Sequence, residues 1–176
     1  MLFAISNSRF RESKTIVLDS LIYVDLTLGR GGHSQEILKR LTTGKLICFD
    51  KDIQAINESR EKLIKISQNF ILIKSDFRNI TCELKKLNID KVDGILADLG
   101  VSSPQLDDPN RGFSYSINSD LDMRMDLDNT LTAKEIINNA TEKEIIDILQ
   151  SNADVKLSNL IAKAIVKNRP ISDSFT

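Results

Sequence analysis

The chain has 176 residues, of which 41% are hydrophobic and 28% are charged, and its formal net charge is −1. This length is typical of one domain, or of one domain with an appendage, and the composition excludes a disordered or fibrous protein. The apolar runs are too short to span a bilayer. Because the charges almost balance, only a local patch could indicate a nucleic-acid partner.

The first 20 residues, Met1 to Ser20, do not have the pattern of a secretory signal. Their charges, including Arg9, Arg11 and Lys14, follow the short apolar start instead of preceding a longer one. Two cysteines, Cys48 and Cys82, fit a reducing compartment, so we expect a cytoplasmic protein without disulfides.

Short apolar runs alternate with helical patterns between Leu21 and Leu99. The predicted strands are 21–28, 46–49, 70–73 and 94–99. The predicted helices are 34–41 with Ser34 as its cap, a helix that Asp52 caps, and 80–87. Strands separated by helices predict βαβ units, and therefore an α/β fold with a doubly wound parallel sheet over residues 21–106.

The character changes after Gly100. Residues 101–129 are rich in Pro, Ser, Asn and Asp and are predicted to be mostly loop, and residues 107–176 are expected to form a loop plus a helical region. Thr132 and Thr141 each begin a capping-box pattern. The last helix has an apolar stripe: Leu157, Leu160, Ile161, Ala164 and Ile165. Beside the stripe lies a candidate RNA-binding surface: Lys156, Lys163, Lys167 and Arg169.

The segment Gly29–Ser34 (GRGGHS) follows the first predicted strand and opens a helix. Glycines there let backbone N–H groups approach a ligand, and the helix start favours negative charge. The next strand ends in Asp50, where an acid in nucleoside-binding sheets accepts hydrogen bonds from ribose hydroxyls. The glycine-rich segment and Asp50 together favour a nucleoside-binding site over a tight turn with a solvated Asp. They do not show whether the nucleoside is NAD or S-adenosylmethionine.

Two further strand ends carry candidate residues. Asp76 and Phe77 follow the third strand, where they could bind an adenine or, equally well, cap a helix and fill the core. Asp98 ends the fourth strand, where cofactor and substrate would meet in an open parallel sheet. Its carboxylate could orient an exocyclic amine, and the alternative is an ordinary strand-end acid. His33, the only histidine, has no partner at metal-ligand spacing, so no metal site is predicted.

Several of these segments together resemble the RsmH family, formerly MraW, of bacterial small-subunit ribosomal RNA methyltransferases. The matching segments are 23–34 (YVDLTLGRGGHS), 49–52 (FDKD), 93–108 (DGILADLGVSSPQLDD), 111–114 (RGFS) and 121–126 (LDMRMD). The resemblance implies a class I S-adenosylmethionine-dependent methyltransferase fold with a helical insertion that recognises RNA. It also implies N4-methylation of a cytidine in 16S rRNA at the decoding centre. The implied cofactor contacts are Gly31, Gly32, His33, Asp50, Phe77, Asp98 and Gln105.

The chain departs from the family pattern at both ends. Residues 1–20 lack the family's opening His-x-Pro-Val-Leu-Leu-x-Glu segment, and the later Phe-His-Ser-Leu-Glu-Asp-Arg motif is missing. Fewer strands are predicted than this fold usually has, which would leave an edge of the fourth strand open. On this basis we expect weak or no activity from the chain alone, and either self-association or a complementing C-terminal chain.

Two other functions are alternatives to rRNA methylation, for which Asp98 is the candidate catalytic residue and the small ribosomal subunit the partner. An NAD-dependent oxidoreductase would need a catalytic His, Tyr or Lys downstream, and no such arrangement is evident. A non-catalytic fragment would bind RNA or a partner chain through the basic surface at Lys156 to Arg169, with an affinity that falls steeply with salt. No membrane partner is expected.

Overall fold

The computed structural model describes residues 21–175. The chain divides into two compact units, the first ending at Gly100 and the second beginning at Val101. This division falls where the sequence changes from apolar runs to polar, turn-forming residues. The predictions made for Met1 to Ser20 lie outside the described residues.

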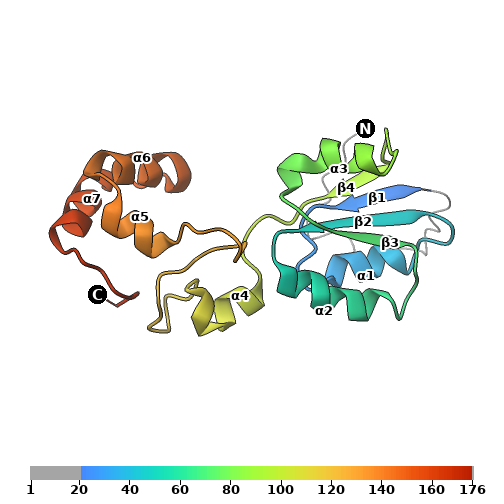
Figure 1. Ribbon diagram of the computed structural model, residues 1–176, viewed down its shortest axis with the longest axis horizontal. Helices are drawn as coiled ribbons and strands as arrows, with labels where there is room; N and C mark the ends of the chain where they lie inside the picture. The colour runs from blue at the N-terminus through green and yellow to red at the C-terminus, as the bar shows by residue number, and fades with distance from the viewer. Residues whose placement is uncertain (1–20, 176) are drawn as a thin grey trace. The chain divides into compact units, whose positions relative to one another are not determined.

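The described part of the first unit, residues 21–100, contains a sheet of four strands: β1 (Ile22–Asp25), β2 (Lys45–Asp50), β3 (Phe70–Lys74) and β4 (Gly94–Leu96). Their order is β3-β2-β1-β4 and every neighbouring pair is parallel, which confirms the predicted parallel sheet (Figure 1). β1 and β4 are shorter than the apolar runs that contain them. The chain leaves both strands early, after Asp25 and after Leu96, to form the turns that carry the candidate site.

Helices cover both faces of this sheet, as a doubly wound fold requires. α1 (Gly32–Leu38) and α2 (Ile53–Leu63) lie on one face, and α3 (Ile80–Lys86) lies on the other (Figure 1). A short 3-10 turn, η1 (Phe77–Asn79), precedes α3. As predicted, Asp52 caps α2, its side chain accepting a hydrogen bond from the Gln54 N–H at 2.9 Å.

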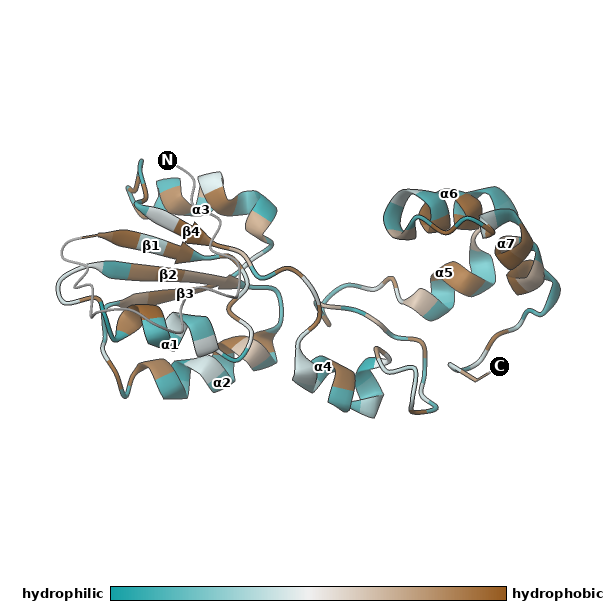
Figure 2. Cartoon of the chain, turned by 180° about the vertical axis from the view of Figure 1, so that it is seen from behind, coloured by the Kyte–Doolittle hydropathy of each residue, from teal (hydrophilic) through white to brown (hydrophobic). Residues whose placement is uncertain are grey.

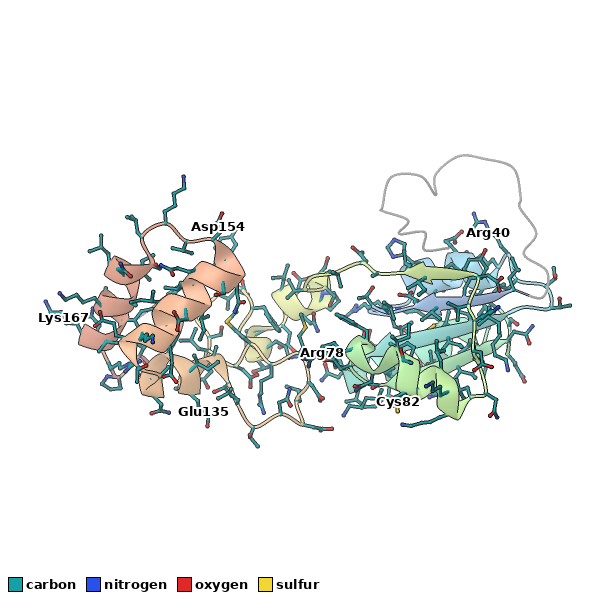
Figure 3. All side chains as sticks on the ribbon, turned by 90° about the horizontal axis from the view of Figure 1, so that it is seen from above. Arg40, Arg78, Cys82, Glu135, Asp154 and Lys167 are labelled. Atoms are coloured by element: carbon teal, nitrogen blue, oxygen red, sulfur yellow. The ribbon has the colours of Figure 1, made fainter. Side chains whose placement is uncertain are left out.

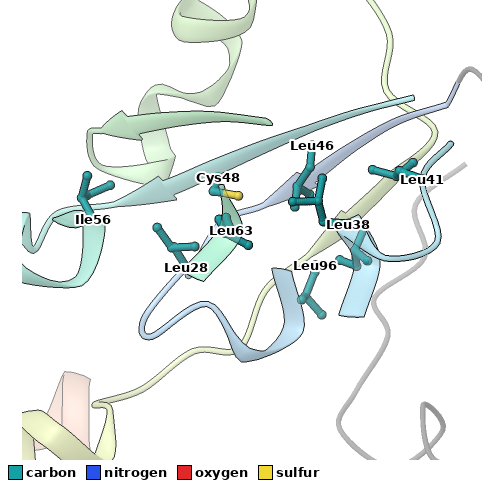
Figure 4. Close-up of a cluster of buried hydrophobic side chains, with 9 residues drawn as sticks. Leu28, Leu38, Leu41, Leu46, Cys48, Ile56, Leu63 and Leu96 are labelled. Carbon is teal, nitrogen blue, oxygen red and sulfur yellow. The ribbon is translucent and has the colours of Figure 1, made fainter. Parts of the chain in front are cut away.

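The central strand β2 contributes to a hydrophobic cluster on each face of the sheet. Leu46 and Cys48 point into the cluster under α1 and α2, which Figure 4 shows, whereas Ile47 and Phe49 point into the cluster under α3. All four side chains are fully buried. This alternation follows from the two-residue period of a strand. Cys48 is therefore a core residue.

The start of α1 differs from the prediction. The helix begins at Gly32 with Gly31 as its N-cap, so Ser34 is not the cap. Instead Ser34 is fully buried, and its hydroxyl donates a hydrogen bond of 2.6 Å to Asp25. The reason is that Gly31 adopts the left-handed conformation, with φ of 74°, and caps the helix three residues before Ser34.

Residues 101–175 of the second unit form five helical segments: α4 (Ser103–Asp107), the 3-10 turn η2 (Pro109–Arg111), α5 (Ala133–Asn139), α6 (Glu142–Ala153) and α7 (Ser158–Lys167). The first two lie in the stretch predicted to be mostly loop. Ser102 and Gln105 form a capping box there, which the sequence analysis did not identify. The two predicted capping boxes, at Thr132 and Thr141, are confirmed.

The apolar stripe of α7 is largely exposed. Leu157 and Leu160 are 61% and 65% exposed, while Ser158 and Ala162 are buried. α7 packs against α6, and the Gln150 amide donates to the Ser158 hydroxyl at 2.9 Å. The helix therefore uses small residues for this contact and leaves large apolar side chains on its surface. Figure 2 shows by its brown colour that α7 is rich in hydrophobic residues.

Candidate functional site

The turn between β1 and α1 requires glycine. Gly29 and Gly31 both have positive φ, of 50° and 74°. A side chain at Gly31 would meet Ser59 of α2 at 3.1–3.2 Å, and the Ser59 hydroxyl donates to the Gly29 carbonyl at 2.8 Å. By contrast, a side chain at Gly32 would meet nothing within 4 Å. The turn is thus fixed against α2 and has open space beside Gly32.

Asp50, at the end of β2, lies directly beside this turn. One carboxylate oxygen accepts the Gly29 N–H at 2.8 Å, and the other accepts the Asp52 N–H at 2.9 Å. Burial raises the pKa of Asp50, and these hydrogen bonds act in the opposite direction. The two oxygens have four lone-pair positions, and those that the N–H groups of Gly29, Lys51 and Asp52 leave free could accept from a hydroxyl group. The structure therefore brings together the glycine turn and the acid that the sequence paired.

A charged cluster follows β3. The Asp76 carboxylate accepts from Lys51 at 2.7 Å and from the Arg78 guanidinium at 2.8 Å, and it caps η1 through the Arg78 N–H. These contacts, first of all the one with Arg78 (labelled in Figure 3), hold the pKa of Asp76 well below its usual range. Of the two roles considered for Asp76, the structure shows the cap. Phe77 is half-buried, with the Lys51 ammonium 6.0 Å from its ring centre.

Asp98 and His33 lie close together at the other side of the turn. The His33 Nδ1 is 4.0 Å from an Asp98 carboxylate oxygen, and the two side chains are 37% and 54% exposed. The Asp98 N–H donates to the Thr27 hydroxyl at 2.7 Å. β1 lies between β2 and β4, so the strand order reverses at β1. Open α/β sheets bind ligands at the carboxyl ends of the strands where this reversal occurs.

Two predicted residues are held by contacts within the second unit. The side-chain oxygen of Gln105, a buried residue, accepts the Ser102 N–H at 2.9 Å. Arg169 donates from Nε to the Ile137 carbonyl at 2.6 Å and also donates to the Ala140 carbonyl. Its guanidinium therefore closes the C-terminal end of α5.

The remaining predicted basic residues, Lys156, Lys163 and Lys167, are exposed on and beside α7. Figure 3 labels Lys167 at the end of that helix. Within residues 21–175 no helix is long and apolar enough to span a membrane, and no cluster of three or more His, Cys, Asp or Glu could hold a metal ion.

Two residues that support the site, Asp25 and Thr27, were not predicted from the sequence, and Ser34 was predicted only as a cap. Asp25 is only 1% exposed, and it was hidden in a run that was interpreted as an apolar strand. An acidic residue inside such a run was the available signal, because a carboxylate is almost never buried without partners.

Comparison with known proteins identifies the family. The model of the MraW methylase family matches residues 12–175. The chain belongs to the MraW methylase family. This confirms the resemblance seen in the sequence, and it identifies the parallel sheet with its helices as part of a class I methyltransferase fold. Membership of a methylase family supports S-adenosylmethionine as the cofactor.

Relatives of this MraW-family chain are curated as "Ribosomal RNA small subunit methyltransferase H". The one from Metamycoplasma arthritidis is 65% identical over 152 residues, covering 86% of this chain and 53% of the relative. The one from Mycoplasmopsis agalactiae is 58% identical over 151 residues, covering 86% and 50%. The chain thus spans about half the length of these relatives.

Among solved structures, a Streptococcus mutans protein in complex with SAH matches with a TM-score of 0.42 and 27% identity. The match covers 51% of this chain and 48% of the other.

Proposed function

We propose that this MraW-family chain provides the cofactor-binding part of a ribosomal RNA methyltransferase of the small subunit. The observation that carries the proposal is the convergence of the glycine turn, Asp50 and the His33–Asp98 pair at the carboxyl ends of β1, β2 and β4. Family membership supplies the reaction class. The proposed substrate is a cytidine of 16S rRNA at the decoding centre, methylated at N4, and the proposal includes a cytoplasmic location.

The proposed cofactor contacts fit the chemistry of S-adenosylmethionine. Asp50 would accept hydrogen bonds from the ribose hydroxyls through its remaining lone pairs, and Gly31 and Gly32 would let the backbone approach the cofactor closely. The half-buried ring of Phe77 would stack on the adenine. His33 and Asp98 complete the proposed set in the first unit. Gln105, in the second unit, stays a prediction from the family resemblance.

Asp98 is the proposed residue for the methyl transfer itself. When bound, S-adenosylmethionine would supply a methyl group on a positively charged sulfur. Methylation at N4 would leave S-adenosylhomocysteine, and the amine proton would pass to the Asp98 carboxylate that accepts this N–H. The lone pair of the cytosine amine is delocalised into the ring, so the amine must be oriented before it can attack. The half-exposed carboxylate of Asp98 would accept an N–H of this amine and hold it in line. Positioning and electrostatics are then the main contributions.

The basic residues Lys156, Lys163 and Lys167 are the proposed contacts to RNA phosphates. All three are exposed, and lysine neutralises phosphates as a point charge. Arg169 belongs to the same predicted surface, but its contacts with the end of α5 favour a structural role.

The test combines binding with methyl transfer. Titration calorimetry is expected to show binding of S-adenosylmethionine and no binding of NAD. In a second assay the chain, alone and together with a chain that supplies the rest of a curated relative, is incubated with labelled S-adenosylmethionine and unmethylated small ribosomal subunits. Mass spectrometry of the digested RNA is expected to find N4-methylcytidine with both chains and little or none with this chain alone. Label on another base would contradict the N4 assignment. Efficient transfer by this chain alone would contradict the expected low activity, and NAD binding would contradict the cofactor assignment.

A further inference from the structure

Asp25 is a buried acid that the proposed mechanism does not use. It ends β1, is 1% exposed, and accepts two hydrogen bonds within the first unit. One carboxylate oxygen accepts the Thr27 N–H at 3.0 Å, and the other accepts the Ser34 hydroxyl at 2.6 Å. Burial raises the pKa of Asp25, and the bonds from Ser34 and Thr27 oppose this shift. Burying a carboxylate is costly, so two strong donors indicate a specific role.

The contact with Ser34 fixes the beginning of α1. Ser34 is fully buried in the first turn of this helix, directly after His33. Its hydroxyl lies between β1 and β2, 2.6 Å from Asp25 and 3.3 Å from the Cys48 sulfur. A shift of Ser34 would therefore also move His33, because the two residues are consecutive in one helical turn.

The contact with Thr27 leads to the opposite side of the site. Thr27 is half-buried, and its hydroxyl accepts the Asp98 N–H at 2.7 Å. The Leu26 N–H donates to the Leu96 carbonyl at 2.9 Å, so the bond to Thr27 continues the pairing of the two chain segments beyond the end of β4. The backbone of Asp98 is in this way attached to the residue that Asp25 orients.

We propose that Asp25 and Thr27 are positioning residues that together set the separation of His33 and Asp98. Asp25 acts on His33 through Ser34, and on Asp98 through Thr27. The His33 Nδ1 and the Asp98 carboxylate, 4.0 Å apart, both belong to the proposed cofactor and substrate site. The inference rests on the proposed function, and neither positioning residue is expected to touch the cofactor.

Substitutions at Thr27 separate this role from simple stability. Thr27→Val keeps the shape of the side chain and removes the hydroxyl that accepts the Asp98 N–H, whereas Thr27→Ser keeps the hydroxyl. Loss of one such hydrogen bond is expected to weaken binding of S-adenosylhomocysteine about five- to tenfold in Thr27→Val. Thr27→Ser is expected to bind within about twofold of the unaltered chain, because its hydrogen bond remains.

The second variant, Asp25→Asn, disturbs both contacts. An amide has one acceptor oxygen and places an NH₂ donor where the carboxylate accepted a hydrogen bond. We expect binding of S-adenosylhomocysteine to weaken by at least about tenfold. Asp93→Asn is the matched control, because Asp93 accepts the Ile22 N–H at 2.8 Å at the start of the same strand. It is expected to leave binding unchanged.

The experiment measures S-adenosylhomocysteine binding by calorimetry, the melting temperature, and the NMR resonance of the Asp98 amide. We expect this resonance to move in Thr27→Val and to return in Thr27→Ser, at nearly constant melting temperature. Equal affinity of Thr27→Val and the unaltered chain would overturn the positioning role while the proposed function stands. An unaltered chain that bound no S-adenosylhomocysteine would overturn the proposed function and, with it, this inference.

Discussion

Replacing Gly31 with alanine is expected to destabilise the first unit by about 2–3 kcal/mol, as two separate costs add. The left-handed backbone, with φ of 74°, costs a residue with a side chain about 1–2 kcal/mol. The new Cβ would meet Ser59 at 3.1–3.2 Å, so Ser59 must shift by a few tenths of an ångström from the position in which it donates to the Gly29 carbonyl. The close contact and the weakened hydrogen bond together cost about 1 kcal/mol.

Gly32→Ala is the matched control for this prediction. Gly32 is the first residue of α1, its φ is not in the left-handed region, and a side chain there meets nothing within 4 Å. Alanine in a helix is expected to be neutral or to stabilise by at most about 1 kcal/mol. Urea unfolding followed by circular dichroism measures both variants. Equal unfolding midpoints for the two would refute the argument from backbone conformation and contact with Ser59.

Three further predictions concern the core, the charged cluster and the basic surface. Phe49→Ala should destabilise the first unit by about 3–5 kcal/mol in urea unfolding, since Phe49 is fully buried, whereas Ile64→Ala, at a side chain that is 55% exposed, should cost far less. Asp76→Asn should lower the free energy of unfolding at neutral pH, because the folded-state pKa of Asp76 is depressed and its carboxylate stabilises the fold above the unfolded pKa. The difference in this free energy from the unaltered chain should shrink as the pH falls below about 4. A difference that stays constant with pH would contradict this. Changing Lys163 and Lys167 to Gln should reduce the steepness of the plot of log binding constant against log salt concentration, measured with a 16S rRNA fragment, by about 0.7 per lost phosphate contact. Arg169→Gln should chiefly lower the melting temperature.

Local patterns in the sequence predicted the elements and much of the candidate site. Capping residues such as Asp52 and Thr132 bind backbone groups within three positions of the chain, so the starts of their helices were predictable from the sequence. The pairing of the glycine turn with Asp50 was predictable as well, because the carboxyl ends of parallel strands share one edge of a sheet.

Contacts between residues that are far apart in the sequence were not predictable. Ser34 was interpreted as a cap, and its partner Asp25 lies across the turn on another element. Arg169 was assigned to the basic surface, because nothing in its own segment indicates that it binds the carbonyls of Ile137 and Ala140. The same holds for the apolar stripe of α7. Its periodicity predicts an apolar face, but it does not predict which face of the helix packs on α6.

The central claim is that one nucleoside cofactor binds where the glycine turn, Asp50 and Asp98 converge. A crystal structure of the chain grown with S-adenosylhomocysteine tests it most directly. The account predicts ribose hydroxyls within hydrogen-bonding distance of Asp50 and the sulfur on the side of His33 and Asp98. Density for the ligand at the opposite ends of the strands, near Lys45 and Leu87, or none at the predicted site under saturating ligand, would contradict it.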